Sequence, residues 1–354
     1  MIGVGGMAKH WIHQVWHSQR ERMTFAGLVD VNAEALHATG EALGVPANCC
    51  FTNTAEAFAQ IEADYCCIVT PPQFHREAVA LACGRGMAIL SEKPIAHTWA
   101  DCCAIIQAVK QAGVKMMVTQ NYRYTQRILT LKKAVSELGV VNYAVCRYAA
   151  DYREPLAWGA AFRHEMPHSL LIEASIHHFD QLRNLTSADC ETLSGFEWHP
   201  GHIRGGDEKF EGSNSFKGET NGLYVLKMSG GSMAHYEGNN LATGKTNSWH
   251  SEYYRVECEG GAAVLEKDHI VRIEERGPSG TLKVCEVPTE KSQWEGHHAI
   301  GVQFLDWIDE SAGGPQPATV LADNIKSAAM MFAAIESGST GKAINVAEMV
   351  RAQA

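Results

Sequence analysis

Two short clusters of the sequence hold a lysine, a carboxylate and an imidazole, the groups that enzymes use to move protons. Lys93 lies in SEKP at 91–94, and Glu173 and His177 lie in EASIHHFD at 173–180. Residues four apart on a helix lie on one face, one turn apart. We therefore expect Glu173 and His177 to share a helix face, and Lys93, on a loop after a strand, to meet them across a cleft. Each residue taken alone also fits a purely structural role: the charged residues as solvated surface groups, and the histidine as a hydrogen-bonded residue of the core.

The opening segment IGVGGMA, residues 2–8, has the G-x-G-x-x-A spacing of a dinucleotide-binding turn. The first glycine allows a tight bend after a strand, the second lets the backbone approach a pyrophosphate, and the small last residue permits close helix packing. The helix that follows presents free N–H groups and the positive end of its dipole. The residues expected to hold a cofactor in this turn are Gly3, Gly5, Gly6, Met7 and Ala8.

Asp30 ends the apolar stretch 25–30, near the spacing of roughly 20 residues at which an acid hydrogen-bonds the ribose hydroxyls of such a cofactor. An acid there repels a 2′-phosphate, so the sequence favours NAD over NADP, with dual use left open. A structural turn followed by a surface aspartate is the alternative interpretation. Only two residues precede Gly3, whereas an average strand has about five. We therefore also expect the natural chain to start upstream.

Polar residues follow three more predicted strands, at the carboxyl edge of the sheet where ligands bind in doubly wound folds. TPPQFH at 70–75, SEKP and QNYRY at 120–124 occupy these positions. A lysine beside a cationic nicotinamide ring can have its pKa lowered enough to exchange protons near neutrality. Pro94 could fix the direction of that lysine, including through a cis bond. The strand-end residues expected to line the cofactor are Thr70, Pro71, His75, Glu92, Lys93 and Gln120.

Strand-like and helix-like segments alternate over residues 1–121. DYCCIVT at 64–70 is nearly continuously apolar, as expected for a strand buried on both faces. Thr98 is suited to cap a helix start, and Gly44 and Gly113 to end helices. The alternation predicts a doubly wound parallel sheet, that is, an α/β dinucleotide-binding domain. The expected strands are 25–30, 64–70, 88–91 and 115–120, and the expected helices are 7–19, 32–43, 73–83 and 98–111.

After about residue 122 the pattern changes, so we expect a second α/β domain over 122–354 that binds substrate. Short strand-like runs separated by Gly-rich turns between 222 and 287 suggest an antiparallel sheet. The last two helices of the sequence could pack against the first domain instead of the second. The expected elements are a strand at 140–152 and helices at about 125–138, 169–185, 297–311 and 319–336. His297 and His298 precede one of these helices and are expected to be exposed.

Composition excludes several classes of function. The formal net charge of −10 without a basic block argues against nucleic acid as a partner. No apolar run approaches ~18 residues, and the start lacks the features of a signal peptide, so neither a membrane partner nor secretion is expected. The eleven cysteines include adjacent pairs but no C-x-x-C. They are expected to be buried thiols in a reducing, cytoplasmic location and not zinc ligands.

Taken together, the motifs resemble the Gfo/Idh/MocA family of NAD(P)-dependent sugar and polyol oxidoreductases. They occur in the family's order over nearly the whole chain. The matching pieces are GVGGMA at 3–8, Asp30, TPPQFH, SEKP, QNYRY, EASIHHFD and ADNIKSAAMMFAAIESGSTGKAI at 322–344. The resemblance implies an N-terminal Rossmann domain and a C-terminal α/β domain with a large open, mostly antiparallel sheet. It also implies NAD as cofactor, with NADP possible, and a homodimer or homotetramer with contacts on that sheet.

The resemblance further implies a Lys, Asp, His set at the substrate, which falls by position on Lys93, Glu173 and His177. Glu173 stands where the family usually has Asp, and Ser175 where it usually has Gly. His177 is expected to take the hydroxyl proton as hydride leaves, and Lys93 to stabilise the alkoxide, although the two roles could be exchanged. No metal ion is expected. The residues expected to contact the substrate are Tyr122, Arg123, Trp158, Arg163, His164 and His178.

Three functions remain open at this point. The first is an NAD-dependent dehydrogenase of a sugar, inositol or related polyol. The second is an NAD-dependent glycoside hydrolase that recycles a bound cofactor, and the third is an NAD-binding regulator without turnover. Substrate specificity is expected to reside in 153–168, in 203–220 and around Trp249 and His250, whose composition does not identify a ligand.

Overall fold

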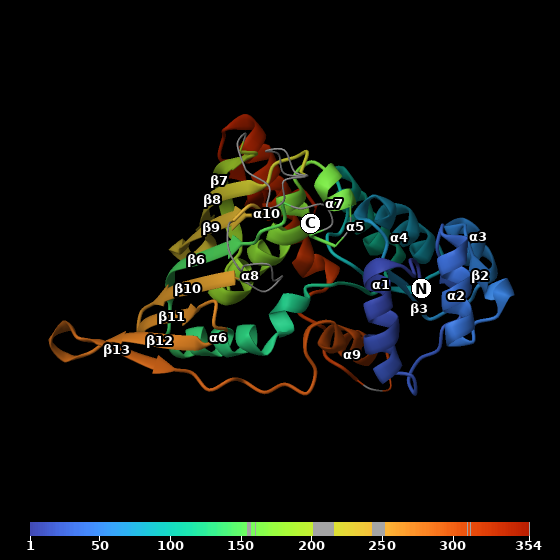
Figure 1. Ribbon diagram of the computed structural model, residues 1–354, viewed down its shortest axis with the longest axis horizontal. Helices are drawn as coiled ribbons and strands as arrows, with labels where there is room; N and C mark the ends of the chain where they lie inside the picture. The colour runs from blue at the N-terminus through green and yellow to red at the C-terminus, as the bar shows by residue number, and fades with distance from the viewer. Residues whose placement is uncertain are drawn as a thin grey trace, which may run out of the picture. The chain divides into compact units, whose positions relative to one another are not determined.

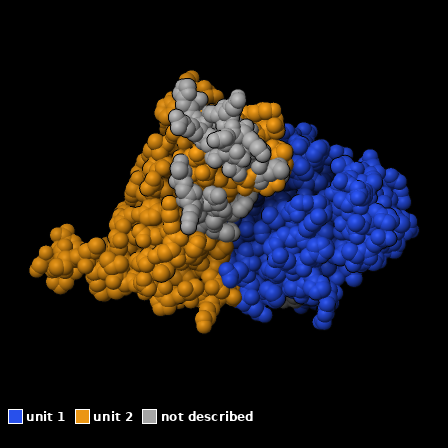
Figure 2. Space-filling view, in the orientation of Figure 1, with its two compact units in different colours: residues 1–124, 293–325, 353 blue, residues 125–292, 326–352, 354 orange. Residues whose placement is uncertain are grey.

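The computed structural model describes residues 1–153, 157–159, 161–200, 216–242, 252–309, 311 and 313–353. The chain forms two compact units, shown in different colours in Figure 2. Unit 1 comprises 1–124, 293–325 and residue 353, and unit 2 comprises 125–292 and 326–352. The division at Tyr124 lies close to the expected boundary, and the segment 293–325 belongs to the first unit. Within the described ranges, no helix combines the length and the apolar character that crossing a membrane requires.

Unit 1 is built on a parallel sheet. Ile2 forms parallel bridges to both Val29 and Ile68 and so joins the two halves of this sheet. The predicted doubly wound Rossmann sheet is therefore confirmed. Its strands are, in spatial order, β2 (Cys50–Phe51), β1 (Leu28–Val29), the Ile2 position, β3 (Tyr65–Ile68), β4 (Ala88–Ser91) and β5 (Met116–Val118).

The helices of unit 1 start and end largely where local signals predict. The side chain of Asn32 accepts a hydrogen bond from the backbone of α2, and that of Thr98 accepts one from α5. Gly44 and Gly113 end these helices with φ of 68° and 66°, as predicted. The helical elements are α1 (Gly6–His10), the π-helix η1 (Trp11–Trp16), α2 (Ala33–Leu43), η2 (Ala47–Cys49), α3 (Thr54–Gln60), η3 (Pro72–Phe74), α4 (His75–Gly84), α5 (Trp99–Ala112), η4 (Asn121–Tyr124) and α9 (Gly296–Ile308).

One face of the parallel sheet is covered by η1 and α9 (Figure 1). Trp11 and Val15 of η1 and Phe304 of α9 are fully buried against Leu90 and Met117 of the strands. Burial of side chains of this size contributes about 1.5–3 kcal/mol each. The late segment that carries α9 is therefore part of the core of the first unit.

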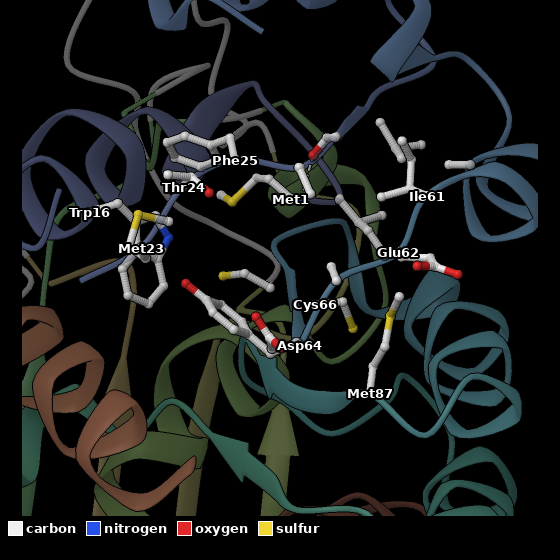
Figure 3. A pocket seen from close by; sticks show the side chains of 18 of the residues that line it. Met1, Trp16, Met23, Thr24, Phe25, Ile61, Glu62, Asp64, Cys66 and Met87 are labelled. Atoms are coloured by element: carbon white, nitrogen blue, oxygen red, sulfur yellow. Dashed lines mark hydrogen bonds between the residues drawn. The ribbon is translucent and has the colours of Figure 1, made fainter. Parts of the chain in front are cut away.

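Unit 1 also contains a cavity of about 460 Å³ beside Met1 (Figure 3). Met23 and Phe25 line it from the segment before β1, Asp64 from the segment before β3 and Met87 from the segment before β4. The cavity therefore lies at the amino edge of the sheet. Because doubly wound sheets bind ligands at the carboxyl edge, we do not assign the cofactor to it.

The described residues of unit 2 form a nine-stranded sheet, and among these strands only β6 and β9 pair in parallel. The prediction of a large, mostly antiparallel sheet is thus confirmed, although β7 was not predicted. In spatial order the strands are β13 (Leu282–Glu286), β12 (Val271–Arg276), β11 (Gly261–Leu265), β10 (Glu252–Cys258), β6 (Val141–Ala149), β9 (Met233–Asn239), β8 (Asn221–Met228), β7 (Cys190–Trp198) and β14 (Ile344–Asn345).

Helices α6 and α8 lie against one face of this sheet (Figure 1). The alternating burial along β8 and β9 places Tyr224 and Tyr236 on the buried, inner face and Leu223, Val225 and Met233 on the outer face. The helical elements are α6 (Gln126–Glu137), α7 (Phe162–Glu165), the π-helix η5 (Leu170–Ser175), α8 (Ile176–Thr186), η6 (Ser229–Gly231), η7 (Pro278–Gly280), α11 (Val346–Arg351) and α10 (Leu321–Thr340), whose first five residues belong to unit 1.

Candidate active site

The glycine turn leaves the start of α1 open to a ligand. Gly3 has φ +87°, and a Cβ there would lie 2.6 Å from the carbonyl oxygen of Val69, so only glycine fits. At Gly5 and Gly6 a Cβ would meet no atom within 4 Å in the part of the chain that the structure describes. The turn thus combines a sterically required glycine with two glycines that border free space. A pyrophosphate needs such space above the backbone.

Asp30 is fixed beside this turn. Its Oδ2 accepts a hydrogen bond of 2.8 Å from the backbone N–H of Val4, and its Oδ1 accepts one of 2.9 Å from that of Asn32. Thr70 borders the turn as well, because its Cγ2 would lie 3.4 Å from a Cβ on Gly3. The buried hydroxyl of Thr70 has no hydrogen-bond partner among the described residues. An orphaned hydroxyl next to the turn fits a ligand that supplies the missing partner.

His75 is completely buried between two strand-end loops. Its Nε2 lies 2.9 Å from the carbonyl oxygen of Thr70, and its Nδ1 lies 3.1 Å from that of Pro94. Burial lowers the pKa of the imidazole, although hydrogen bonds to the backbone raise it in part. His75 therefore holds the loop after β3 and the loop after β4 together.

Lys93 is anchored through its backbone at the carboxyl end of β4. Its N–H donates to the Oγ1 of Thr119 at 3.0 Å and to the Oε2 of Glu92 at 3.2 Å. The peptide bond between Lys93 and Pro94 is cis. Thr119 also donates its hydroxyl to Glu92 at 2.8 Å. These contacts fix the backbone from which the lysine side chain extends.

The Glu92 carboxylate is buried and turns toward helices η1 and α9. Its Oε1 accepts a hydrogen bond of 2.8 Å from Nε1 of Trp11 and lies 3.4 Å from Nε2 of His297. Burial by itself raises the pKa of this carboxyl, but the hydrogen bonds from His297 and Trp11 and the nearby positive charges lower it well below its usual range. The expectation that His297 is exposed is wrong, since only 12% of its side chain is accessible. Its pairing with Glu92 was not predicted.

Replacing Glu92 with glutamine is expected to lower the free energy of unfolding by about 1–3 kcal/mol near neutral pH, because charged hydrogen bonds are lost in a buried site. Folding lowers the pKa of Glu92, so its contribution is complete above the unfolded value of ~4.3 and is lost as the pH falls through the folded value. The difference between wild type and variant should therefore shrink on acidification. Urea unfolding between about pH 3 and pH 7 measures this. Glu77→Gln, on the exposed side of α4, is the control, and a difference that does not change with pH contradicts the assignment.

In unit 2, Glu173 and His177 lie on consecutive helical segments, Glu173 in η5 and His177 in α8. Both side chains are almost completely buried. A π-helical turn inside a longer helix is rare and is often found at functional sites. Ser175, between them, donates or accepts a hydrogen bond of 2.6 Å with the hydroxyl of Tyr236 and bonds to the carbonyl of Leu170. This serine therefore ties η5 to the sheet.

Arg163 and Trp158 lie beside Glu173. The Nε of Arg163 donates to the Oε2 of Glu173 at 2.9 Å, and its Nη1 donates to the carbonyl of Trp158 at 2.7 Å. Trp158 is fully buried, with its indole stacked on Tyr152 at 5.2 Å between ring centroids. Its indole therefore packs in the interior of the unit. The guanidinium of Arg163 is more accessible to solvent than either the Trp158 indole or the Glu173 carboxylate.

The remaining residues expected at the substrate also have structural contacts. His164 is buried and stacks on Phe216 at 4.1 Å, and burial lowers the pKa of its imidazole. Nδ1 of His178 lies 3.2 Å from the hydroxyl of Tyr236, which belongs to the sheet. In unit 1, Tyr122 is buried, and Arg123 donates to the carboxylate of Asp323 at 2.9 Å. The stretches 201–215 and 243–251, which include Trp249 and His250, lie outside the described residues.

Unit 1 holds a nucleotide-binding turn and a strand-end lysine, and unit 2 holds a buried histidine and a Glu–Arg pair. A Rossmann sheet with an open glycine turn, a fixed acid after the second strand and an anchored lysine at the carboxyl edge defines a class of NAD-dependent oxidoreductases.

The chain belongs to the Gfo/Idh/MocA family. The family model GFO_IDH_MocA, oxidoreductase family with an NAD-binding Rossmann fold, matches residues 1–120. An uncharacterised protein, y4oX of Sinorhizobium fredii, is 35% identical over 99% of this chain and 96% of its own length.

A D-apiose dehydrogenase from Rhizobium rhizogenes is 22% identical over 99% of this chain and 97% of its own. Among solved structures, an oxidoreductase from Agrobacterium radiobacter in complex with NAD⁺, L-tartaric acid and magnesium superimposes with a TM-score of 0.80 at 20% identity, covering 98% of both chains. At 20% identity, the similarity to this solved structure shows the fold alone. The chain is thus an NAD-binding enzyme of the dehydrogenase type whose relatives include sugar dehydrogenases.

Proposed function

We propose that this protein transfers a hydride between NAD and a hydroxyl-bearing or carbonyl carbon of a sugar, inositol or related polyol. The observation that carries the proposal is the anchored backbone of Lys93 at the carboxyl end of β4, in the same unit as the open glycine turn and Asp30. A regulator without turnover has no need of a lysine held in this way.

The roles proposed for the side chains follow from their chemistry. When bound, the nicotinamide supplies the acceptor for the hydride. His177 accepts the proton of the substrate hydroxyl, because an imidazole has its pKa in the right range. Lys93 donates a hydrogen bond to the same oxygen and stabilises the negative charge that develops on it. In the direction of reduction, the hydride goes to the carbonyl carbon and His177 returns the proton to the oxygen.

Other residues are proposed to bind or position these groups. Arg163 is proposed to bind substrate hydroxyls, held by its ion pair with Glu173. Glu173 is then a positioning residue. Asp30 is proposed to bind the ribose hydroxyls and to disfavour NADP.

The proposal is tested by absorbance at 340 nm with purified protein, NAD or NADP, and a panel of aldoses, inositols and aminosugars. A steady rise with one substrate, greater with NAD than with NADP, is expected. A signal that is absent across the panel, with NAD released when the protein is denatured, would instead favour the glycoside hydrolase that recycles its cofactor. The absence of both turnover and tightly bound NAD would leave a regulator and overturn the enzymatic proposal.

We also propose that the outer face of the nine-stranded sheet binds a second copy of the chain. Apolar side chains are exposed there in adjacent strands: Phe196 of β7 is paired with Leu223 of β8, and Val225 follows on the same face of β8. A patch of this kind on a sheet face is typical of a protein–protein interface.

We further propose that the protein is located in the reducing environment of the cytoplasm, which fits the eleven free thiols.

Replacing Val225 with glutamate is expected to convert the oligomer to a smaller species, because burying an unpaired carboxylate in an apolar interface is strongly unfavourable. Light scattering coupled to size-exclusion chromatography measures the mass. Leu282→Glu, on the exposed end strand β13, is the matched control and should leave the mass unchanged. If Val225→Glu keeps the wild-type mass, or if the wild type is a monomer, the outer face is not the interface.

A further inference from the structure

Three side chains with metal-binding groups converge in unit 2, apart from the residues assigned to catalysis. His168, Glu197 and Glu219 each place one ligand atom within 4.8 Å of the others. Nδ1 of His168 lies 2.6 Å from Oε1 of Glu197 and 3.4 Å from Oε2 of Glu219. They come from three separate parts of the chain: the segment before η5, strand β7 and the residues that lead into β8.

The carboxylate of Glu197 is buried more deeply than a surface ion pair requires. Only 4% of its side chain is exposed, and its Oε2 has no hydrogen-bond partner among the described residues. A Cβ on Gly338 of α10 would lie 2.9 Å from the Cγ of Glu197, so the helix packs directly on this side chain. A buried carboxylate oxygen without a partner is costly, which points to a ligand that the oxygen would contact.

A second buried polar group points toward the same place. Tyr224 is completely buried on the inner face of β8, and its hydroxyl has no partner in the described part of the chain. Its ring lies over two glycines, because a Cβ on Gly195 would meet its Cδ1 at 2.5 Å and one on Gly222 its Cε2 at 3.0 Å. Gly222 is the cross-strand partner of Glu197. The phenol therefore extends along β8 toward the position of that carboxylate.

We propose that His168, Glu197 and Glu219 bind a divalent first-row transition-metal ion of the Zn²⁺ type. Two carboxylates balance the charge of such an ion, and an imidazole nitrogen favours it over Mg²⁺ or Ca²⁺. Zinc ligands lie about 2.0–2.2 Å from the ion, so three of them must lie within ~4.4 Å of one another. The ligand atoms of a tetrahedral ion lie about 3.4 Å apart. Nδ1 of His168 is already 3.4 Å from Oε2 of Glu219, and its 2.6 Å separation from Oε1 of Glu197 would have to widen to admit the ion. The phenol of Tyr224 would then hydrogen-bond a ligating oxygen or a bound water.

Such an ion would connect the segment that enters η5 to strands β7 and β8. Glu173 and His177 follow in η5 and α8, so the metal would hold the start of the helical segment that carries them. The proposed role is structural. It does not depend on whether the enzyme acts on a sugar, and its test does not use activity.

The experiment is a Zn²⁺ titration of the full-length protein, freed of metal by a chelator and dialysed, with bound Zn²⁺ measured by competition with a chromogenic chelator. The wild type is expected to bind one equivalent more than Glu197→Gln and Glu219→Gln. Tyr224→Phe should keep that equivalent with about 10–100-fold lower affinity. Glu191→Gln is the matched control, because Glu191 lies on the same strand in a surface ion pair with Lys227.

The alternative is a simple ion pair, in which a protonated His168 lies between the two carboxylates. It predicts that wild type and Glu197→Gln bind the same number of Zn²⁺ ions, including any held by other histidines. That result, or no Zn²⁺ binding by the wild type, would overturn the proposal. Glu219 is one-third exposed, so Glu219→Gln should fold even if Glu197→Gln does not, and circular dichroism of each variant checks this.

Discussion

Replacing His177 with asparagine is expected to lower kcat by about 10²–10⁴-fold, the contribution usual for a general base. Asparagine is close to histidine in size and can occupy the same buried position in α8, but it cannot accept the hydroxyl proton. The affinity for NADH should change little, because the glycine turn and Asp30 that would bind it belong to unit 1. Initial rates with the substrate found in the 340 nm panel and a fluorescence titration with NADH measure the two quantities.

The matched control is His37→Asn, because His37 is largely exposed on α2. It should leave both rate and stability unchanged. A pH profile separates the roles of the two proposed groups. The acid limb of kcat/KM should disappear in His177→Asn and persist, at a lower rate, in Lys93→Met. If the acid limb disappears in Lys93→Met instead, the lysine is the proton acceptor. A kcat of His177→Asn equal to that of the wild type would contradict any role of this histidine in the chemistry.

Substituting the glycines of the turn is expected to separate stability from cofactor binding. Gly3→Ala should lower the free energy of unfolding by at least ~2 kcal/mol, because its φ is +87° and its Cβ would collide with the Val69 carbonyl. For a unit of this size that corresponds to a fall in Tm of roughly 4–8 °C. Gly5→Ala should change stability by less than ~1 kcal/mol, because φ at Gly5 is −87° and a methyl group there enters open space.

The effect on cofactor binding should be the reverse. The methyl group of Gly5→Ala would occupy the space proposed for the pyrophosphate, so the Kd for NADH should rise at least ~10-fold, or ~1.4 kcal/mol. Gly44→Ala serves as a control for a strained glycine away from the turn, since Gly44 has φ +68° at the end of α2. It should lower stability and leave the Kd unchanged. Unchanged NADH binding in Gly5→Ala would show that the turn does not hold the pyrophosphate.

Features that depend on neighbours in sequence could be predicted well. Asn32 and Thr98 start helices and Gly44 and Gly113 end them, because capping needs only the side chain or backbone conformation at that position. The strand 88–91 was also placed correctly, since its apolar run is bounded on both sides. Short elements such as β2 and α3 were missed, because two strand residues and two helical turns leave little periodicity.

Contacts between distant segments could not be predicted. His297 is next to another histidine at a helix start, and nothing nearby indicates that it pairs with the buried Glu92. In the same way, the ion pair of Arg123 with Asp323 was not predicted, and a contact of Arg123 with substrate stays a prediction. In each case the partner is fixed by tertiary packing, which a single sequence does not encode in its local pattern.

The assignment of 293–325 to unit 1 has a consequence for synthesis on the ribosome. When residue 124 has left the exit tunnel, every strand of the parallel sheet has been made, but α9, which covers Leu90 and Met117, has not. At 5–20 residues per second, the nascent sheet waits roughly ten to forty seconds for its covering helix. During that interval η1 is present, but the part of that apolar face that α9 covers is open to chaperones or to other nascent chains. A truncated chain that ends after residue 124 would keep the α9-covered part of that face exposed permanently.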